Sequence, residues 1–409
     1  MSPAPTLLRT GIALGASVLA LVATSPATPA WAEEQVTVDV LKVVDGEYVV
    51  ETVTVPARTA EASADSLEAA PEVVAASPSV TYEVTGDPDP HWDEQDPQAT
   101  SRVRGVWDRT RGAGQVVAVL DTAATFVHPD LAGASVAGTD VVGGTGDPWH
   151  GTGAAGVIAA RADNGIGGAG MAPGARVMPV RVCNDGGCPS AAVAQGILWA
   201  ADHGADVVNM SLGGAGYSDV TAVAVQYALD RGISVVASAG NDGLNGNPVV
   251  FPAANSGVIA VSATTPEGAP AAWAVHGWQV DIATVGEDVL LPYPGDGYVE
   301  GSGTSFSGPA VAGAVALLRS AVPGIAPEQV QAALQAGADS SAGWDRAWGA
   351  GRLDVPAALA AADRTAAAPT VTAASGTLGV SWPAVAGAGS YRVRVDGVVR
   401  AEVTAPARR

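Results

Sequence analysis

The amino-acid sequence predicts an α/β protein with a doubly wound, mostly parallel sheet that carries helices on both faces, preceded by a small α+β domain. Short apolar runs rich in Val and Ile alternate with helical stretches after about residue 105. The apolar runs lie at 116–120, 176–182, 207–210, 233–238 and 258–263, and the helical stretches at 152–160, 190–202 and 219–231. Continuous apolar strands separated by helices are typical of parallel strands buried on both faces. With 409 residues, 48% of them hydrophobic, the chain can build a large core.

Residues 33–88 predict the small α+β domain. Residues 35–44 and 48–55 predict two strands joined by an Asp45-Gly46 turn, because Asp-Gly between β-branched runs favours a hairpin. Residues 59–70 predict a helix, and residues 71–84 predict one or two more strands. Residues 86–98 are dense in Pro and Asp and predict an exposed linker, so we place a domain boundary there.

Residues 1–32 have the pattern of a signal peptide. Arg9 precedes an apolar run at 11–23, and Ala30-Trp31-Ala32 forms a small-x-small cleavage site. We therefore expect a secreted protein with no membrane attachment after cleavage; an uncleaved anchor is the alternative. The apolar run at 309–318 is followed at once by Arg319 and predicts a buried helix.

Residues 364–409 form a separate tail after the α/β region, which we bound at 89–363. Trp382 and the alternation of Tyr391, Val393 and Val395 predict a small β module. The segment resembles the opening strands of a fibronectin type III domain, but it is too short for a whole sandwich. A partly ordered tail is an equally open interpretation.

Charge and cysteine content exclude several classes of function. The formal net charge is −21 and Lys42 is the only lysine, which argues against nucleic acid and anionic membranes as partners. The sequence implies no nucleotide and no cofactor. Cys183 and Cys188 predict a disulfide in an exported protein, because two cysteines alone make a poor metal site.

Two polar residues follow strands of the predicted parallel sheet. Asp121 comes directly after the run at 116–120, and Asn241 lies just past the run at 233–238. Ligands of doubly wound domains bind beyond the carboxyl ends of the strands. Both residues are therefore candidates for a functional site at that edge.

Three segments carry a resemblance to a known family: VAVLDTAATFVHPDL at 117–131, HGTGAAGVIAA at 150–160 and SGTSFSGPAVAG at 302–313. Together they resemble the subtilisin family of serine proteases, in that family's order. Further matches are GMAP at 170–173, VVNMSLGG at 207–214, SAGNDG at 238–243, FPAA at 251–254 and VIAVSA at 258–263. The resemblance covers roughly residues 100–360 and implies a subtilisin-like fold and a serine endopeptidase that cleaves proteins or peptides.

The resemblance implies a catalytic triad of Asp121, His150 and Ser305. A serine hydroxyl is a weak nucleophile and needs a general base, which in turn needs a partner that fixes its tautomer. Ser305 lies just before an apolar helix with Pro309 near its start, so free N–H groups and the helix dipole favour an oxyanion there. The order Asp, His, Ser is that of subtilisins. An α/β-hydrolase needs a histidine after its serine, and none follows His276.

The resemblance also implies the remaining site residues. The amide of Asn241 completes an oxyanion hole with the N–H of Ser305. An extended substrate pairs with one segment and meets a second wall opposite it. The first segment is Ser211, Leu212, Gly213 and Gly214, and the second wall is Ala239 and Gly240. Val250 predicts a shallow pocket for medium-sized apolar side chains, whereas Asp242 at its rim favours a basic one.

Two more features of the family concern stability and maturation. Asp130 matches an aspartate that often binds a structural calcium, and Asp163 and Asn164 lie in the loop that completes such a site; an ordinary turn aspartate is the alternative. Residues 33–88 resemble a subtilase prodomain, an intramolecular inhibitor and folding aid. We expect this prodomain to be removed by a cut within residues 84–98.

Several motif neighbours depart from the family. Ala123 stands where Gly is usual, Gly153 lies where a second histidine is usual, and Val285 replaces a frequent Pro. These departures keep open a catalytically weak or silent fold that acts as an extracellular binding protein. A third hypothesis is a membrane-tethered maturation protease of a secretion system, whose relatives usually carry a C-terminal transmembrane helix.

Overall fold

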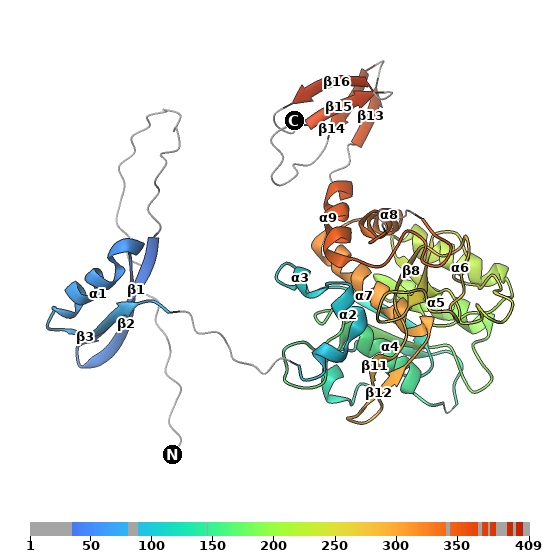
Figure 1. Cartoon of the computed structure of the whole chain (residues 1–409), viewed down its shortest axis with the longest axis horizontal. Coiled ribbons are helices and arrows are strands. Elements are labelled where there is room, and N and C mark those ends of the chain that lie inside the picture. The colour runs from blue at the N-terminus through green and yellow to red at the C-terminus, as the bar shows by residue number, and fades with distance from the viewer. Residues whose placement is uncertain are drawn as a thin grey trace. The chain divides into compact units, whose positions relative to one another are not determined.

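The computed structural model describes residues 35–80, 89–144, 146–340, 344–366, 370–374, 377–381, 391–395 and 398–403. The chain divides into two compact units, with the division between Thr85 and Gly86 (Figure 1). The predicted signal peptide at 1–32, residues 81–88 and Trp382 lie outside the described residues. None of the helices in the described part of the chain is long and apolar enough to cross a membrane.

The described residues of unit 1 form a three-stranded antiparallel sheet with one α-helix and a short 3-10 helix. Its elements are β1 (Gln35–Val44), β2 (Glu47–Pro56), η1 (Ala57–Thr59), α1 (Ala60–Glu68) and β3 (Val73–Pro78), in the sheet order β2-β1-β3. Asp45 and Gly46 both have positive φ and make the predicted hairpin turn. Val38, Val40 and α1 enclose a small core, and Lys42 of β1 pairs with Glu51 of β2 at 2.6 Å. The predicted hairpin and helix are present.

The opposite face of this small sheet is open. Val43 pairs with Tyr48, and Leu41 pairs with Val50, so these four side chains share one face. Tyr48 is 73% exposed and Val50 is 67% exposed. Unit 1 therefore presents an apolar sheet face that its own helix does not cover.

Unit 2 contains a seven-stranded parallel sheet in the order β10-β9-β8-β7-β4-β6-β5. The strands are β4 (Val116–Asp121), β5 (Thr139–Asp140), β6 (Arg176–Arg181), β7 (Val207–Met210), β8 (Ser234–Ser238), β9 (Val258–Thr264) and β10 (Ile282–Val285). After β6 the chain crosses to the other side of β4 and continues through β7 to β10. The order therefore reverses at β4, and such a point is where doubly wound sheets bind ligands.

Helices cover both faces of this sheet (Figure 1). The main helices are α4 (Trp149–Ala159), α5 (Ser190–Asp202), α6 (Asp219–Asp230), α7 (Thr304–Ala321), α8 (Pro327–Gly337) and α9 (Val355–Ala366). Val117 and Val119 of β4 join the core on the side of α4 and α7, whereas Ala118 and Leu120 join the core on the side of α5. This alternation explains why the strand is apolar from Val116 to Leu120. The predicted fold class is confirmed.

Smaller elements complete the described residues of unit 2. They are η2 (Trp92–Glu94), α2 (Asp96–Thr100), α3 (Arg104–Trp107), η3 (Pro129–Leu131) and the hairpin β11 (Val289–Pro292) with β12 (Tyr298–Gly301). The described residues of the tail form two antiparallel strand pairs, β13 (Thr370–Ala374) with β14 (Thr377–Ser381) and β15 (Tyr391–Val395) with β16 (Val398–Val403).

The prediction that residues 86–98 form an exposed linker is wrong for 89–98. The side chain of Asp89 is 2% exposed and accepts hydrogen bonds from the backbone N–H groups of Asp163 and Asn164. Gln95 accepts from the N–H of Ala169, and Gln98 donates to its carbonyl oxygen. The prolines do preclude a long helix, but distant backbone groups anchor this segment to unit 2.

Candidate active site

Asp121 is the last residue of β4, at the reversal point of the sheet. It is 2% exposed. Its Oδ1 accepts hydrogen bonds from Nδ1 of His150 at 2.7 Å and from the N–H of Thr122 at 2.6 Å. Its backbone carbonyl accepts from the N–H groups of Val182 and Cys183 after β6. The sheet thus fixes the backbone of Asp121, and the carboxylate bonds the imidazole through Oδ1.

His150 is the second residue of α4. Thr122 ties the start of this helix to the end of β4, because its hydroxyl oxygen accepts from the N–H of Gly151 at 3.2 Å. Two aromatic rings flank the imidazole, Trp149 at a centroid distance of 5.4 Å and Phe306 at 5.5 Å. Burial lowers the pKa of His150, but the hydrogen bond and charge of Asp121 outweigh it and raise the pKa above its ordinary value.

Ser305 lies in the first turn of α7, which begins one residue earlier, at Thr304, with Gly303 as its N-cap. The prediction placed Ser305 before the helix, and this is wrong, because Ser305 is the second residue of α7. Like the other N–H groups of a first helical turn, that of Ser305 has no helical acceptor, and among the described residues it has no other acceptor. Ser305 is half-buried, and its free N–H lies at the positive end of an 18-residue helix.

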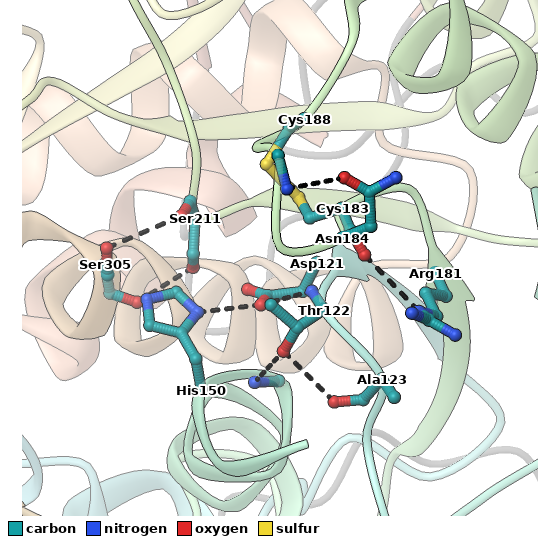
Figure 2. The surroundings of a disulfide bond; sticks show 12 residues. Asp121, Thr122, Ala123, His150, Arg181, Cys183, Asn184, Cys188, Ser211 and Ser305 are labelled. Carbon is teal, nitrogen blue, oxygen red and sulfur yellow. Dashed lines mark hydrogen bonds and ion pairs between the residues drawn. A yellow bond between two sulfur atoms is a disulfide. The ribbon is translucent and has the colours of Figure 1, made fainter. Parts of the chain in front are cut away.

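Figure 2 shows the imidazole of His150 between Asp121 and Ser305. The hydroxyl of Ser305 donates weakly to the carbonyl oxygen of Ser211, at 3.5 Å. No hydrogen bond joins Ser305 to His150 within the described residues, and such bonds often shorten only when substrate binds. The fold brings the three residues together from β4, α4 and α7.

Asn241 follows β8 in an exposed loop. Its Oδ1 accepts from the N–H of Thr304 at 3.0 Å and from the hydroxyl of Thr304 at 2.9 Å. These two donors fix the amide orientation, so that its Nδ2 lies near Gly303, where an added Cβ would be 3.3 Å from it. Asn241 therefore presents an N–H donor beside the start of α7. Sequence reasoning missed Thr304, although it lies inside the quoted motif.

A cavity of about 290 Å³ adjoins Ser305. Its lining includes Ser211, Leu212, Gly213 and Gly214, together with Gly240, Asn241, Asp242 and Val250. A Cβ on Gly213 or Gly240 would approach the methyl groups of Val250 to 2.5 Å or 2.8 Å, so Val250 fills the space between the two walls. Ala239 is fully buried and does not line the cavity, because its N–H continues the ladder toward β9 at Val261.

A second cavity of about 410 Å³ also borders Leu212, Gly213 and Gly214. Gly187 and Cys188 contribute to its lining. Cys188 forms a disulfide with Cys183, five residues earlier, as predicted (Figure 2). The bond closes the loop that leaves β6 beside Asp121, and so stiffens one wall of this cavity.

Asp130 lies away from these cavities and is fully buried. It accepts hydrogen bonds from Nδ2 of Asn164 at 2.9 Å, from the hydroxyl of Tyr298 at 3.1 Å and from the N–H of Gly168 at 3.3 Å. Burial raises the pKa of Asp130 to about 6 despite these donors, and the charge of Asp89 adds to the shift. The carboxylate of Asp163 instead pairs with Arg111 at 2.6 Å.

These residues supply some, but not all, of the ligands that a hard cation needs. Two buried carboxylates, Asp89 and Asp130, have only neutral hydrogen-bond donors around them, and oxygen ligands are what Ca²⁺ prefers. Within the described residues no group of three or more acidic, His or Cys side chains gathers, so backbone or water oxygens would be needed as well. Sequence reasoning missed Asp89, because its partners lie about 75 residues away along the chain.

Comparisons with known proteins agree with this geometry. The model of the Subtilase family matches residues 112–351. Thermitase from Thermoactinomyces vulgaris is 39% identical over 272 residues, which cover 63% of this chain and 96% of thermitase. Subtilisin DY from Bacillus licheniformis is 37% identical over 255 residues, covering 61% of this chain and 92% of that protein.

Solved structures show the same likeness. A protease from Pseudoalteromonas arctica superposes with a TM-score of 0.62 at 30% identity, covering 67% of this chain and 98% of that one. Fervidolysin from Fervidobacterium pennivorans, a keratinolytic enzyme related to subtilisin, gives a TM-score of 0.62 at 26% identity, over 80% of this chain and 61% of that one. The sheet order, the family match and these relatives lead to one conclusion: this chain belongs to the subtilase family and is a serine-type endopeptidase.

Proposed function

We propose that the protein is a secreted endopeptidase that hydrolyses peptide bonds through Asp121, His150 and Ser305 and is matured by removal of its prodomain. The observation that carries the proposal is the 2.7 Å hydrogen bond between Asp121 and His150, made beside a serine at the N-terminus of α7. The alternative, a catalytically silent binding protein, is not favoured, because the arrangement contains all three reacting side chains.

The residues divide the chemistry as follows. Ser305 Oγ attacks the scissile carbonyl carbon while Nε2 of His150 takes its proton. Asp121 keeps the proton of His150 on Nδ1 and stabilises the imidazolium that forms. His150 then gives its proton to the leaving amine, which leaves an acyl group on Ser305, and a water molecule activated by His150 hydrolyses that ester.

Two donors stabilise the negative oxygen of the tetrahedral intermediates. The N–H of Ser305 has no competing acceptor in the described residues. Its nitrogen and Nδ2 of Asn241 lie close to the same point, 3.6 Å and 3.3 Å from where a Cβ on Gly303 would stand. Both are held in place before substrate binds, the first by α7 and the second by Thr304. Such preorganised donors stabilise the transition state more than the ground state.

A fluorophosphonate probe tests this proposal, because it reacts with an activated serine. We expect stoichiometric labelling at Ser305, at a rate that falls as the pH drops through a pKa above 6.5. The sign follows from the raised pKa of His150, since only the neutral imidazole accepts the proton. An unlabelled Ser305, or a labelling rate that does not change between pH 5 and 9, would contradict the proposed triad.

We also propose that the 290 Å³ cavity accepts the side chain before the cleaved bond, and that Val250 limits it to medium-sized apolar groups. Val250→Gly should raise kcat/KM for Phe over Val at this position by about tenfold or more. Peptides varied at that one position measure this change. Asp242→Asn is the matched variant: if Asp242 instead selects a basic side chain, this variant loses that preference. A flat preference in the wild type would contradict both ideas.

We propose that unit 1 is the prodomain and inhibits unit 2 until it is removed. Its open sheet face with Tyr48 and Val50 supports this, because an exposed apolar face needs a partner. The anchoring of Asp89 in unit 2 supports a cut on its N-terminal side, toward the start of the expected 84–98 interval. Export follows from the signal-peptide pattern at 1–32.

We propose a structural calcium ion near Asp130, bound by the carboxylates of Asp89 and Asp130 together with backbone or water oxygens. If it binds, EDTA should lower the melting temperature of the wild type. Asp130→Asn should melt at a lower temperature and respond less to EDTA, because it removes a charged ligand. A wild-type melting curve that is the same with EDTA and with added calcium would leave Asp130 as a hydrogen-bonded turn residue.

A further inference from the structure

The carbonyl group of Ser305 lacks the donor that a helix normally provides. In an α-helix, each carbonyl oxygen accepts from the N–H four residues later. For Ser305 that residue is Pro309, which has no N–H and lies inside α7. A buried carbonyl without a donor is unfavourable, so another group has to replace the missing one.

Ser211 provides that donor from a different part of the chain. Its hydroxyl, only 6% exposed as a residue, donates to the carbonyl oxygen of Ser305 at 2.8 Å. Nδ2 of the fully buried Asn209 donates to the same hydroxyl at 3.1 Å. Because the hydroxyl has one hydrogen and already accepts from Asn209, that hydrogen is directed to Ser305. Figure 2 shows Ser211 and Ser305 facing each other.

This hydrogen bond fixes the backbone on the C-terminal side of the candidate nucleophile, Ser305. Asn241 accepts from the N–H of Thr304, on the N-terminal side of Ser305. Ser211 holds the carbonyl group of Ser305 itself. Because the backbone is held on both sides, the directions of Ser305 Oγ and of its N–H are set before substrate binds. A displacement of about 1 Å in such geometry lowers the reaction rate on the order of 10²-fold.

We propose that Ser211 is a positioning residue whose side-chain hydroxyl replaces the N–H that Pro309 cannot supply, and so holds Ser305 in the geometry for attack. This inference rests on the proposed nucleophilic role of Ser305. It concerns the side chain of Ser211, and is separate from the pairing of its backbone with substrate.

The test uses the full chain carrying Ser211→Ala, Pro309→Ala, or both. Ser211→Ala should lower kcat and the fluorophosphonate labelling rate by about 10- to 100-fold, with KM unchanged. Pro309→Ala restores an N–H four residues after Ser305, so the double variant should recover most of the lost kcat. A hydroxyl that only stabilises the fold would not be rescued in this way.

Ser307→Ala is the matched control. Ser307 is fully buried in the same turn, and its hydroxyl donates to the carbonyl of Thr304 at 3.2 Å. That carbonyl also accepts from the hydroxyl of Ser238 at 2.6 Å, so kcat should stay at the wild-type level. If Pro309→Ala does not fold, the kcat values of Ser211→Ala and Ser307→Ala are compared instead, and only Ser211→Ala should show a loss.

Four results separate the failure of this inference from the failure of the proposed function. Wild-type kcat in Ser211→Ala, or a double variant whose losses simply multiply, overturns the role of Ser211. Equal losses in Ser211→Ala and Ser307→Ala also overturn it, because any buried hydroxyl of this turn would then matter alike. Activity that persists in Ser305→Ala overturns the proposed function itself.

Discussion

Ser305→Ala should abolish casein hydrolysis and leave unit 1 covalently attached. The substitution removes the only atom that forms the acyl-enzyme, so kcat should fall by on the order of 10⁴ to 10⁶. The side chain is small and half-buried, and its hydroxyl makes only a 3.5 Å hydrogen bond. The fold should therefore survive. Intact mass and casein hydrolysis, followed over time for chains expressed without residues 1–32, measure both effects.

The two readouts of this experiment separate catalysis from maturation. If the wild type shortens by roughly 50 to 65 residues, the span from Glu33 to the 84–98 interval, and the variant does not, the enzyme processes itself. If both chains shorten but only the wild type digests casein, another protease removes unit 1. If both digest casein equally, Ser305 is not the nucleophile.

Asn241→Leu should lower kcat by on the order of 10² to 10³ with little change in KM, because it removes a donor used mainly in the transition state. Asn241 is exposed, so the loss of its side chain should not unfold unit 2. Steady-state kinetics on a peptide amide measure the effect.

Asn241→Asp is the matched variant for this residue. It keeps an oxygen to accept from the N–H and hydroxyl of Thr304 but has no N–H to donate. If Asn241 acts through its donor, both variants lose kcat. If it acts only by holding Thr304, Asn241→Asp should retain most of the activity, and the oxyanion role would be refuted.

Local patterns were enough to predict much of this fold. The β-branched runs, the Asp-Gly turn and the disulfide each depend on residues that are near neighbours in sequence, and the structure has all of them. The motifs also pointed to Asp121, His150 and Ser305 as a candidate triad, and the fold brings these three residues together. The motifs did not show which hydrogen bonds hold the site residues in position. The hydrogen bond from the hydroxyl of Ser211 to the carbonyl oxygen of Ser305 spans 94 positions, and no local pattern indicates it.

The wrong predictions also arise because local sequence does not show contacts between residues that are far apart along the chain. Residues 89–98 are locally typical of a linker, yet Asp89 is anchored by backbone groups 74 and 75 positions away. Ser305 was placed before its helix because an apolar run marks where burial begins, whereas the helix begins at Thr304 beside a glycine N-cap. The family resemblance placed Ala239 in a wall of the substrate site, and this role stays a prediction. Its side chain is fully buried, and its neighbour Gly240 lines the cavity.

The position of Lys42 on β1 has a practical consequence. It is the only lysine in the chain, and it belongs to unit 1. If unit 1 is cut away, as proposed, the rest of the chain contains no ε-amine. An amine-directed acylating reagent at neutral pH then has one target on it, the α-amino group created by the cut. A single dye, biotin or surface linker can therefore be attached at a defined end, and the labelled terminal peptide reports which bond was cleaved.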